Sequence, residues 1–333
     1  MLDDKQCSEA KTVLEDFSLA RPCMPAAEMP ACLHNYLEFY GFFETLKGIE
    51  VDYFWGYRCC APGARIATHF WRLPNAKGNV LLVHGLFDHV GLFLPLIRHF
   101  LNQGYSVIAL DLPGHGLSDG EVTVINSFEQ YGEILLDTAQ FFAPQTQTLP
   151  LYGVGQSTGA AALMALEFDL YKKQLPSVFE RLVFLGPLVR PRQWGIARWI
   201  YRLLGRRLRY VARDFSNANT HDAEFHHFLK SFDPLQPRRL STQWVGALNQ
   251  WVDGFASQPV VETPLLVVQG TADKVVDWQL NIPAIKEHFS CVQVNMIEGA
   301  KHHLANEADP WRKAIYGSVG QFFRQRVVCV LPS

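Results

Sequence analysis

A serine between glycines is the first feature of the sequence that could perform chemistry. Residues 155–159 read GQSTG and place Ser157 directly after an apolar run and directly before an alanine-rich segment. A sharp turn from a strand into a helix exposes a serine hydroxyl in this way, and the glycines leave room for neighbouring segments. A nucleotide-binding loop is disfavoured, because Gly153, Gly155 and Gly159 lack the G-x-G-x-x-G spacing and no Gly-Lys-Ser/Thr follows. We therefore interpret Ser157 as a nucleophile, in preference to a turn serine or a helix N-cap.

Activation of this serine requires a base, and the base requires an acid that orients it, because a hydroxyl is a weak nucleophile near neutral pH. Two downstream loops provide both groups: TADKVVD contains Asp273, and EGAKHHLANE contains His302. Each loop follows a short apolar run, so each side chain stands just past the end of an expected strand. Asp277 is the alternative acid, but it directly precedes an expected helix and suits its N-cap. His303 is the alternative base.

The segments that must position these side chains alternate between strands and helices. Six apolar runs are too short to be helices: residues 79–85, 105–111, 149–155, 181–186, 264–270 and 292–297. Amphipathic stretches lie between them, and this alternation indicates a parallel sheet covered by helices on both faces. In such sheets functional groups collect at the carboxyl ends of the strands. The sequence therefore predicts an α/β fold with a mostly parallel central sheet.

Two further segments precede or interrupt this pattern. Residues 1–46 predict a helical N-terminal extension, and the alternating aromatic residues that follow predict two antiparallel strands. No buried strand is expected from Pro187 to Ser257, where Arg, Trp and Tyr recur at helical spacing, so we interpret this interval as a helical cap (lid) inserted between two strands. The expected organisation is an extension (1–46), a first core part (47–186), the cap (187–257) and a second core part (258–333).

An ordered set of motifs extends over about residues 50–325: VHGLFDH, DLPGHGLSDG, GQSTG, DPL, QGTADKVVD and EGAKHHLANE. In this order the set resembles the monoacylglycerol lipase and lysophospholipase (serine aminopeptidase-like) branch of the α/β-hydrolases. The resemblance implies an α/β-hydrolase fold, in which the triad follows the chain order Ser, Asp, His. The Gly-Ala-x-His phrase of the family ends here at His302, which favours this residue over His303.

The resemblance also implies a role for each residue of the site. Ser157 would attack an ester carbonyl, His302 would take its proton and return it to the leaving alcohol, and Asp273 would hold the imidazole. The backbone N–H groups of Leu86 and Thr158 would form the oxyanion hole.

The sequence departs from the family pattern at three positions. Gln156 and Thr158 flank the serine where the family usually has His and Met, and Phe87 stands where a small residue is common. These changes keep the triad and the amide donors. We expect them to reshape the floor of the pocket and to narrow the site beside the oxyanion hole.

Other histidines have a structural interpretation. His84 and His115 lie in loops after strands, where such residues usually hydrogen-bond the backbone. The segment HDAEFHHF (221–228) does not match H-E-x-x-H, so we interpret it as a solvated surface of the cap.

The expected cap carries a basic segment in which arginines recur at intervals of three and four residues: Arg198, Arg202, Arg206, Arg209 and Arg213. Apolar residues occupy other faces: Trp199, Ile200, Leu203, Leu204, Leu208 and Val211. A basic face beside an apolar one suits contact with anionic lipid headgroups. Gly205 interrupts this segment, so we favour the alternative of an ordinary amphipathic helix with its apolar side packed on the core and its arginines in water.

The composition argues against several classes of function. A charged fraction of 19% and a formal net charge of −2 indicate a globular protein without a nucleic-acid partner. The acidic N-terminal segment does not read as a secretory signal, and seven scattered cysteines, among them Cys59 and Cys60, indicate reduced thiols. We therefore expect a cytoplasmic protein that is peripheral on membranes. No metal ion or organic cofactor is expected, because paired Cys or His spacings typical of zinc sites are missing from the sequence.

These observations predict a serine hydrolase that cleaves carboxylic esters through an acyl-enzyme. The expected substrate is a single-chain lipid, either a monoacylglycerol or a lysophospholipid, because an apolar helical cap could enclose one long acyl chain. Two alternatives remain, because the same motifs and fold serve many functions. One is a carboxylesterase or thioesterase for small soluble acyl compounds, and the other is a non-catalytic ligand-binding or interaction protein.

Overall fold

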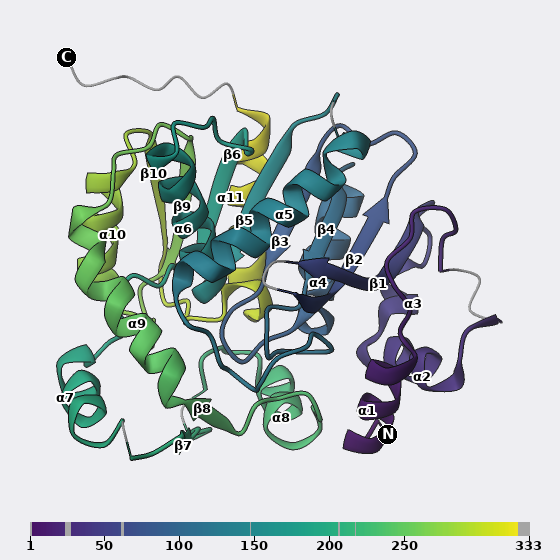
Figure 1. Ribbon diagram of the computed structural model, residues 1–333. Coiled ribbons are helices and arrows are strands. Elements are labelled where there is room, and N and C mark those ends of the chain that lie inside the picture. Colours follow the sequence, from purple (N-terminus) through teal and green to yellow (C-terminus); the bar gives the residue numbers. More distant parts are fainter. Residues whose placement is uncertain are drawn as a thin grey trace.

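An eight-stranded sheet lies at the centre of the computed structural model, which describes residues 2–23, 28–60, 63–146, 148–205, 207–216 and 218–325. The strand order is β1-β2-β4-β3-β5-β6-β9-β10 (Figure 1). The strands are β1 (Asp52–Cys60), β2 (Ala64–Arg72), β3 (Asn79–Val83), β4 (Ser106–Leu110), β5 (Leu151–Gln156), β6 (Arg181–Leu185), β9 (Leu265–Gly270) and β10 (Val292–Ile297). β2 is antiparallel to β1 and to β4, and all other neighbours are parallel. The prediction of a mostly parallel α/β sheet is confirmed.

Helices cover both faces of the sheet, because successive strand residues contribute to two different apolar cores. In β3, Val80 and Leu82 belong to one core, and Leu81 and Val83 belong to the other. The first core includes side chains of α4 (Leu94–Asn102) and α11 (Trp311–Arg324). The second includes side chains of α5 (Phe128–Thr146), α6 (Thr158–Lys172) and α10 (Trp278–His288). Strands buried on both faces account for the nearly continuous apolar runs of the sequence.

The N-terminal segment packs beside β1, at one edge of the sheet (Figure 1). It forms α1 (Asp4–Val13), α2 (Ala31–Tyr40) and α3 (Phe42–Leu46). Between α1 and α2, the Phe17 amide donates to the Tyr57 carbonyl at 2.7 Å, and the Tyr57 amide donates to the Glu15 carbonyl at 2.8 Å. The rings of Tyr36 and Trp55 stack with their centroids 5.2 Å apart. The segment therefore covers backbone groups that an edge strand would otherwise leave unpaired.

The interval between β6 and β9 contains helices and a small ribbon of strands. Its elements are α7 (Trp194–Leu204), β7 (Tyr210–Ala212), α8 (Ala223–Ser231), β8 (Arg239–Ser241) and α9 (Thr242–Gly254). The sequence predicted the helices but not β7 and β8, which pair in antiparallel fashion. Strands of three residues are too short to show an alternating pattern in the sequence.

The prediction of one helical face with five arginines is wrong. α7 ends before Gly205, so only Arg198 and Arg202 lie on it. Glycine is a poor helix former, and the helix does not continue through it. Arg198 binds Asp253 at 2.7 Å. Arg206 lies outside the described residues.

The two remaining arginines have separate environments beyond α7. Arg209 precedes β7 and binds Glu121 at 2.6 Å. Arg213 follows β7, and its guanidinium carbon lies 4.1 Å from the centroid of the Phe87 ring. Neither arginine therefore extends the polar face of α7.

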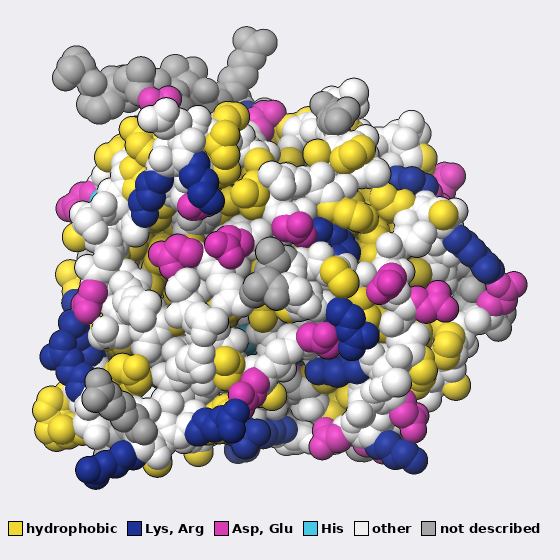
Figure 2. Space-filling model, viewed as in Figure 1, with side chains coloured by type: hydrophobic (Ala, Val, Ile, Leu, Met, Phe, Trp, Pro, Cys, Tyr) yellow, Lys and Arg dark blue, Asp and Glu magenta, His cyan; other side chains and the backbone are white. Residues whose placement is uncertain are grey.

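The apolar face of α7 is exposed, contrary to the packed helix that we favoured. Ile196 is 63% exposed, Trp199 is 64% exposed and Leu203 is 54% exposed. Figure 2 shows hydrophobic side chains at the lower left corner, where Figure 1 places α7, and Lys and Arg side chains nearby along the lower edge. Exposed apolar side chains that gather on one helix often mark a contact surface.

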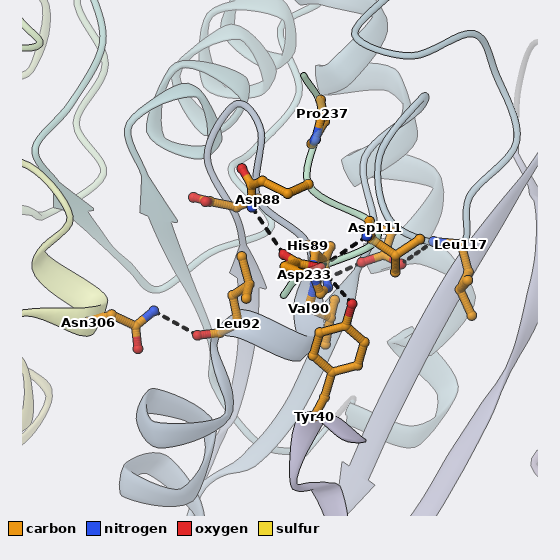
Figure 3. A network of polar contacts seen from close by, with 12 residues as sticks. Tyr40, Asp88, His89, Val90, Leu92, Asp111, Leu117, Asp233, Pro237 and Asn306 are labelled. Carbon is orange, nitrogen blue, oxygen red and sulfur yellow. Dashed lines mark hydrogen bonds and ion pairs between the residues drawn. The ribbon is translucent and has the colours of Figure 1, made fainter. Parts of the chain in front are cut away.

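A buried polar network joins the N-terminal segment, the loop after β3 and the interval between β6 and β9 (Figure 3). Asp233, which follows α8, accepts a hydrogen bond from the Tyr40 hydroxyl at 2.7 Å and lies 3.2 Å from His89 Nε2. In the same loop, Val90 donates its amide to Asp111 Oδ1 at 2.8 Å. Removing one member of a buried charged pair typically costs about 3–5 kcal/mol of stability. The network therefore fixes the loop that leads from β3 toward the site.

The redox state of the described cysteines agrees only in part with the prediction that all cysteines are reduced thiols. Cys7, Cys23, Cys32, Cys59 and Cys60 are free. Cys291 is disulfide-bonded, so the prediction is wrong for this residue. Because free and disulfide-bonded cysteines occur together, they do not indicate whether the protein resides in a reducing or an oxidising compartment.

No helix within the described residues is both long enough and apolar enough to cross a lipid bilayer.

Candidate active site

Ser157 occupies the turn between β5 and α6. Its backbone adopts φ 53° and ψ −109°, a strained conformation for a residue other than glycine. The flanking glycines permit close approach of other segments. A Cβ at Gly155 would lie 2.5 Å from the Ala160 nitrogen, and a Cβ at Gly159 would lie 2.2 Å from the Val83 carbonyl oxygen. The strand, sharp turn and helix expected around GQSTG are all present.

His302 contacts both Ser157 and Asp273. Its Nε2 lies 3.0 Å from Ser157 Oγ, and its Nδ1 lies 2.7 Å from Asp273 Oδ2. Ser157, Asp273 and His302 follow β5, β9 and β10, respectively, so the carboxyl ends of parallel strands bring them together. This geometry suits transfer of the hydroxyl proton to an imidazole that a carboxylate orients.

Four hydrogen bonds hold the Asp273 carboxylate. Besides His302, Gln269 Nε2 donates to Oδ2 at 2.9 Å, and the amides of Val275 and Val276 donate to Oδ1 at 2.8 and 3.2 Å. Burial alone would raise the pKa of Asp273, but the charge of His302 and these hydrogen bonds lower it below its usual value. Burial alone would lower the pKa of His302, but Asp273 outweighs this effect and raises it. An ionised Asp273 thus stabilises the imidazolium form of His302.

The alternative acid and base have other partners. Asp277 stands at the N-cap position of α10, as expected, but its carboxylate binds Arg190 at 2.6 Å instead of capping the helix. His303 Nε2 lies 3.3 Å from Asp88 Oδ1. Asp277 and His303 therefore bind other side chains and take no part in the hydrogen bonds that link Ser157, His302 and Asp273.

The loop after β3 lies beside Ser157. A Cβ at Gly85 would be 3.4 Å from the Ser157 Cβ. The His84 ring fixes this loop, because Nδ1 donates to the Gly85 carbonyl at 2.7 Å and Nε2 accepts from the Leu112 amide at 2.8 Å. Burial lowers the pKa of His84 to about 3, so the neutral ring can both donate and accept. These contacts agree with the structural role expected for His84. Leu86 comes directly after Gly85, so the His84 ring holds the backbone that leads into Leu86.

A cavity of about 300 Å³ adjoins Ser157 and His302. Leu86 and Thr158 line it beside Ser157. Its apolar wall comes largely from the interval between β6 and β9: Leu188, Trp194, Ala197, Leu240, Trp244, Val245 and Leu248. Phe87 also lines the cavity, in agreement with the expectation that its bulk affects this part of the site. The arrangement places the Ser157 hydroxyl and the His302 imidazole at one end of an apolar pocket, which suits a ligand with a hydrocarbon chain.

Residues 74–309 match the family described as serine aminopeptidase, S33. This match covers more than half of the chain. The chain belongs to the serine aminopeptidase S33 family. Its motifs and its structural neighbours confirm the predicted α/β-hydrolase fold and the resemblance to monoacylglycerol lipases and lysophospholipases.

Several proteins are similar to this family member over most of their length. The monoglyceride lipase homolog of Monkeypox virus is 24% identical over 79% of this chain and 95% of its own. The monoglyceride lipase of Homo sapiens is also 24% identical, over 80% of this chain and 89% of its own. A soluble variant of monoglyceride lipase from Saccharomyces cerevisiae, solved with a substrate analog, has a TM-score of 0.69 at 18% identity and covers 82% of this chain and 95% of its own. The structural similarity shows the shared fold.

In this member of the S33 family, Gln156 connects the turn at Ser157 with the loop that carries His302. Its Nε2 donates to the His302 carbonyl at 3.0 Å, and its Oε1 accepts from the Ala305 amide at 3.3 Å. The sequence identified Gln156 only as a departure from the family pattern. Its position next to the nucleophile was the available signal, but its distant partners could not be inferred from a local motif.

His115 and His221 have hydrogen-bond partners of structural type. His115 Nδ1 donates to the Pro113 carbonyl at 2.9 Å, and His221 Nδ1 lies 2.9 Å from Glu307 Oε1. Asp222 caps α8 by accepting from the Phe225 amide at 2.9 Å. Within the described ranges, no group of three or more His, Cys, Asp or Glu side chains could hold a metal ion.

Proposed function

We propose that this protein is a serine hydrolase that cleaves carboxylic esters through an acyl-enzyme on Ser157. The observation that carries the proposal is the contact chain from Ser157 through His302 to Asp273 at the end of an apolar cavity. The strained backbone of Ser157 adds support, because strain of this kind is concentrated at functional turns. The intact chain of contacts disfavours a purely ligand-binding role.

The proposed reaction proceeds in two halves. His302 takes the Ser157 proton as the hydroxyl attacks the ester carbonyl, and then returns this proton to the leaving alcohol. A water molecule, activated by the same imidazole, then releases the acid from Ser157. Asp273 keeps the imidazole oriented and stabilises its charged form. This mechanism requires neither a metal ion nor an organic cofactor.

We assign the oxyanion hole to the backbone N–H groups of Leu86 and Thr158. Both residues line the cavity beside Ser157, and Thr158 is the first residue of α6. An amide at a helix N-terminus stabilises developing negative charge. The His84 ring supports this assignment indirectly, because it fixes the loop that leads into Leu86.

The substrate that we propose is a single-chain lipid, a monoacylglycerol or a lysophospholipid. The cavity next to Ser157 is lined by aliphatic and indole side chains such as Leu188, Trp244 and Leu248, which suit one acyl chain. The names of the relatives, monoglyceride lipases and a phospholipase of Bacillus subtilis, point in the same direction. The segment of residues 187–257 would act as the cap over this chain.

The acyl-chain dependence of hydrolysis tests this proposal. We expect kcat/KM for monopalmitoylglycerol to exceed that for monobutyrylglycerol by at least about a hundredfold, since each buried CH₂ contributes about 0.8 kcal/mol. Leu248→Ser should reduce this preference, whereas Leu280→Ser, at an exposed position of α10, should not. A preference for the butyryl ester would support the small-ester alternative, and failure to cleave either ester would support a non-catalytic protein.

We further propose that α7 makes transient, peripheral contact with a membrane surface. Ile196, Trp199 and Leu203 already expose an apolar face, so inserting them into lipid removes apolar area from water. Arg202 lies on the same helix and can interact with anionic headgroups. The exposure of these apolar residues in the structure disfavours a helix that only packs on the core.

Vesicle sedimentation tests this contact. The combined change Ile196→Ser, Trp199→Ser and Leu203→Ser should lower partitioning onto phosphatidylcholine–phosphatidylglycerol vesicles by at least about tenfold, because three apolar side chains no longer insert. Tyr171→Ser with Leu175→Ser is the control, because both side chains are exposed and apolar but lie away from α7. Tyr171 is in the last turn of α6, and Leu175 follows this helix. Equal partitioning of the α7 variant and the wild type would contradict the proposal.

A further inference from the structure

A second hollow meets the cavity of Ser157 at His302. It has a volume of about 660 Å³, and we call it the basic groove after Arg192, Lys274 and Lys301, which line it together with His302. Asn219, Val275 and His302 line both the groove and the apolar cavity. The imidazole therefore stands between an apolar compartment and a cationic one.

The described residues that line the groove offer its three cations no neutralising carboxylate. Arg192 and Lys274 are exposed, and Lys301 is half-buried, with its ammonium donating to the Thr220 carbonyl at 3.0 Å. Among the described residues that line the groove, none is an aspartate or a glutamate. Within the same described part of the chain, none of the three side chains forms an ion pair with a carboxylate.

Carboxylates close to the groove are already engaged by other cations. Asp273 binds His302, and Asp277 binds Arg190 at 2.6 Å. Asp88 also lines the apolar cavity; burial alone would raise the pKa of this carboxyl, but the hydrogen bond and charge of His303, with the charges of His84 and Arg213, lower it to about 2. Positive charge in the basic groove therefore remains available to an anionic ligand.

Backbone contacts hold two of the cations at one rim of the groove. The Arg192 amide donates to the Val275 carbonyl at 2.9 Å, and Pro191 and Val276 form an isolated antiparallel bridge. This contact joins the segment after β6 to the loop after β9. The backbones of Arg192 and Lys274 are consequently held at the same rim, so both side chains start from neighbouring fixed points.

We propose that the basic groove binds a phosphate-bearing leaving group, so that a lysophospholipid with a net anionic headgroup is preferred over a neutral monoacylglycerol with the same acyl chain. This inference rests on the proposed function. With the acyl chain in the apolar cavity, the alcohol part of the ester extends past His302 into the groove. The acyl C–O bond breaks, the alcohol oxygen takes the His302 proton, and the acyl group stays on Ser157 until water releases it as fatty acid.

Kinetics with two matched esters tests the inference. The substrates are palmitoyl lysophosphatidylglycerol and monopalmitoylglycerol in micelles of one neutral detergent, and the quantity measured is the ratio of their kcat/KM values. The double change Arg192→Gln and Lys274→Gln should lower this ratio about tenfold, as expected for the loss of two exposed charge interactions. Raising the ionic strength should lower the ratio of the wild type as well, because salt screens exposed charges.

Lys172→Gln with Lys286→Gln is the control, because it removes two exposed positive charges from outside the groove. An equal fall of the ratio in this control would overturn the inference in favour of general attraction by net charge. An unchanged ratio in the groove variant, with both esters still cleaved, would overturn the anion subsite and leave the ester hydrolase standing. Failure of the wild type to release palmitate from either ester would overturn the proposed function itself.

Discussion

Replacement of Ser157 by alanine is expected to lower kcat for palmitate release about a millionfold, because the attacking oxygen is lost and the remaining groups form no acyl-enzyme. Ser157 Oγ lies 3.0 Å from His302 Nε2 and at the end of the apolar cavity. Release of palmitate from monopalmitoylglycerol and from palmitoyl lysophosphatidylcholine measures the effect. A fluorophosphonate probe should label the wild type and fail to label the variant.

Ser257→Ala is the matched control for this experiment, because Ser257 is exposed and its hydroxyl only donates to the Gly254 carbonyl. Its activity and labelling should equal those of the wild type. Circular dichroism and the unfolding temperature should show that Ser157→Ala folds. Palmitate release by a folded Ser157→Ala variant within about tenfold of the wild type would exclude the proposed acyl-enzyme.

Replacement of Asp273 by asparagine should have the second largest effect, a fall in kcat of about 10⁴-fold. The new side chain would present an amide where His302 Nδ1 now faces a carboxylate at 2.7 Å, and would favour the wrong tautomer of the imidazole. Steady-state hydrolysis of monopalmitoylglycerol measures this loss. The matched variant Asp277→Asn breaks the ion pair with Arg190 but leaves the contacts of His302 in place, so we expect it to retain most of the activity.

The pH profile gives a second readout for Asp273→Asn. His302 must be neutral to accept the Ser157 proton, and Asp273 raises its pKa above the usual value of 6.5. The kcat/KM of the wild type should therefore fall as the pH decreases through a value above 6.5, and this acidic limb should move to lower pH in the variant. A larger loss of activity in Asp277→Asn than in Asp273→Asn would make Asp277 the acid.

Local patterns were sufficient to predict the fold and to identify Ser157. The strand at residues 151–156, the turn and α6 are encoded within one continuous stretch, because apolar runs and flanking glycines act on neighbouring residues. Asp273 and His302 were inferable for a related reason. Each directly follows a strand of a parallel sheet, and the carboxyl ends of such strands share one edge.

The interval between β6 and β9 was harder to predict from local patterns. The spacing of the arginines suggested one basic face interrupted at Gly205, but α7 ends before Gly205, and Arg209 and Arg213 contact Glu121 and Phe87 separately. Periodicity indicates which residues share a face of a helix. It does not indicate where the helix ends or whether that face is covered, so the exposure of Trp199 could not be predicted.

The sequence by itself determined the alternation of strands and helices in the central sheet, the turn at Ser157 and the chain order of the three proposed catalytic residues, because propensity, period and turn chemistry operate over a few residues. Only the tertiary structure decided that Gln156 holds the His302 loop, that α7 exposes its apolar face and that Arg192, Lys274 and Lys301 line one groove. These features depend on contacts between segments distant in the chain. Such contacts are selected by the packing of the whole domain and leave no periodic signal in any one segment.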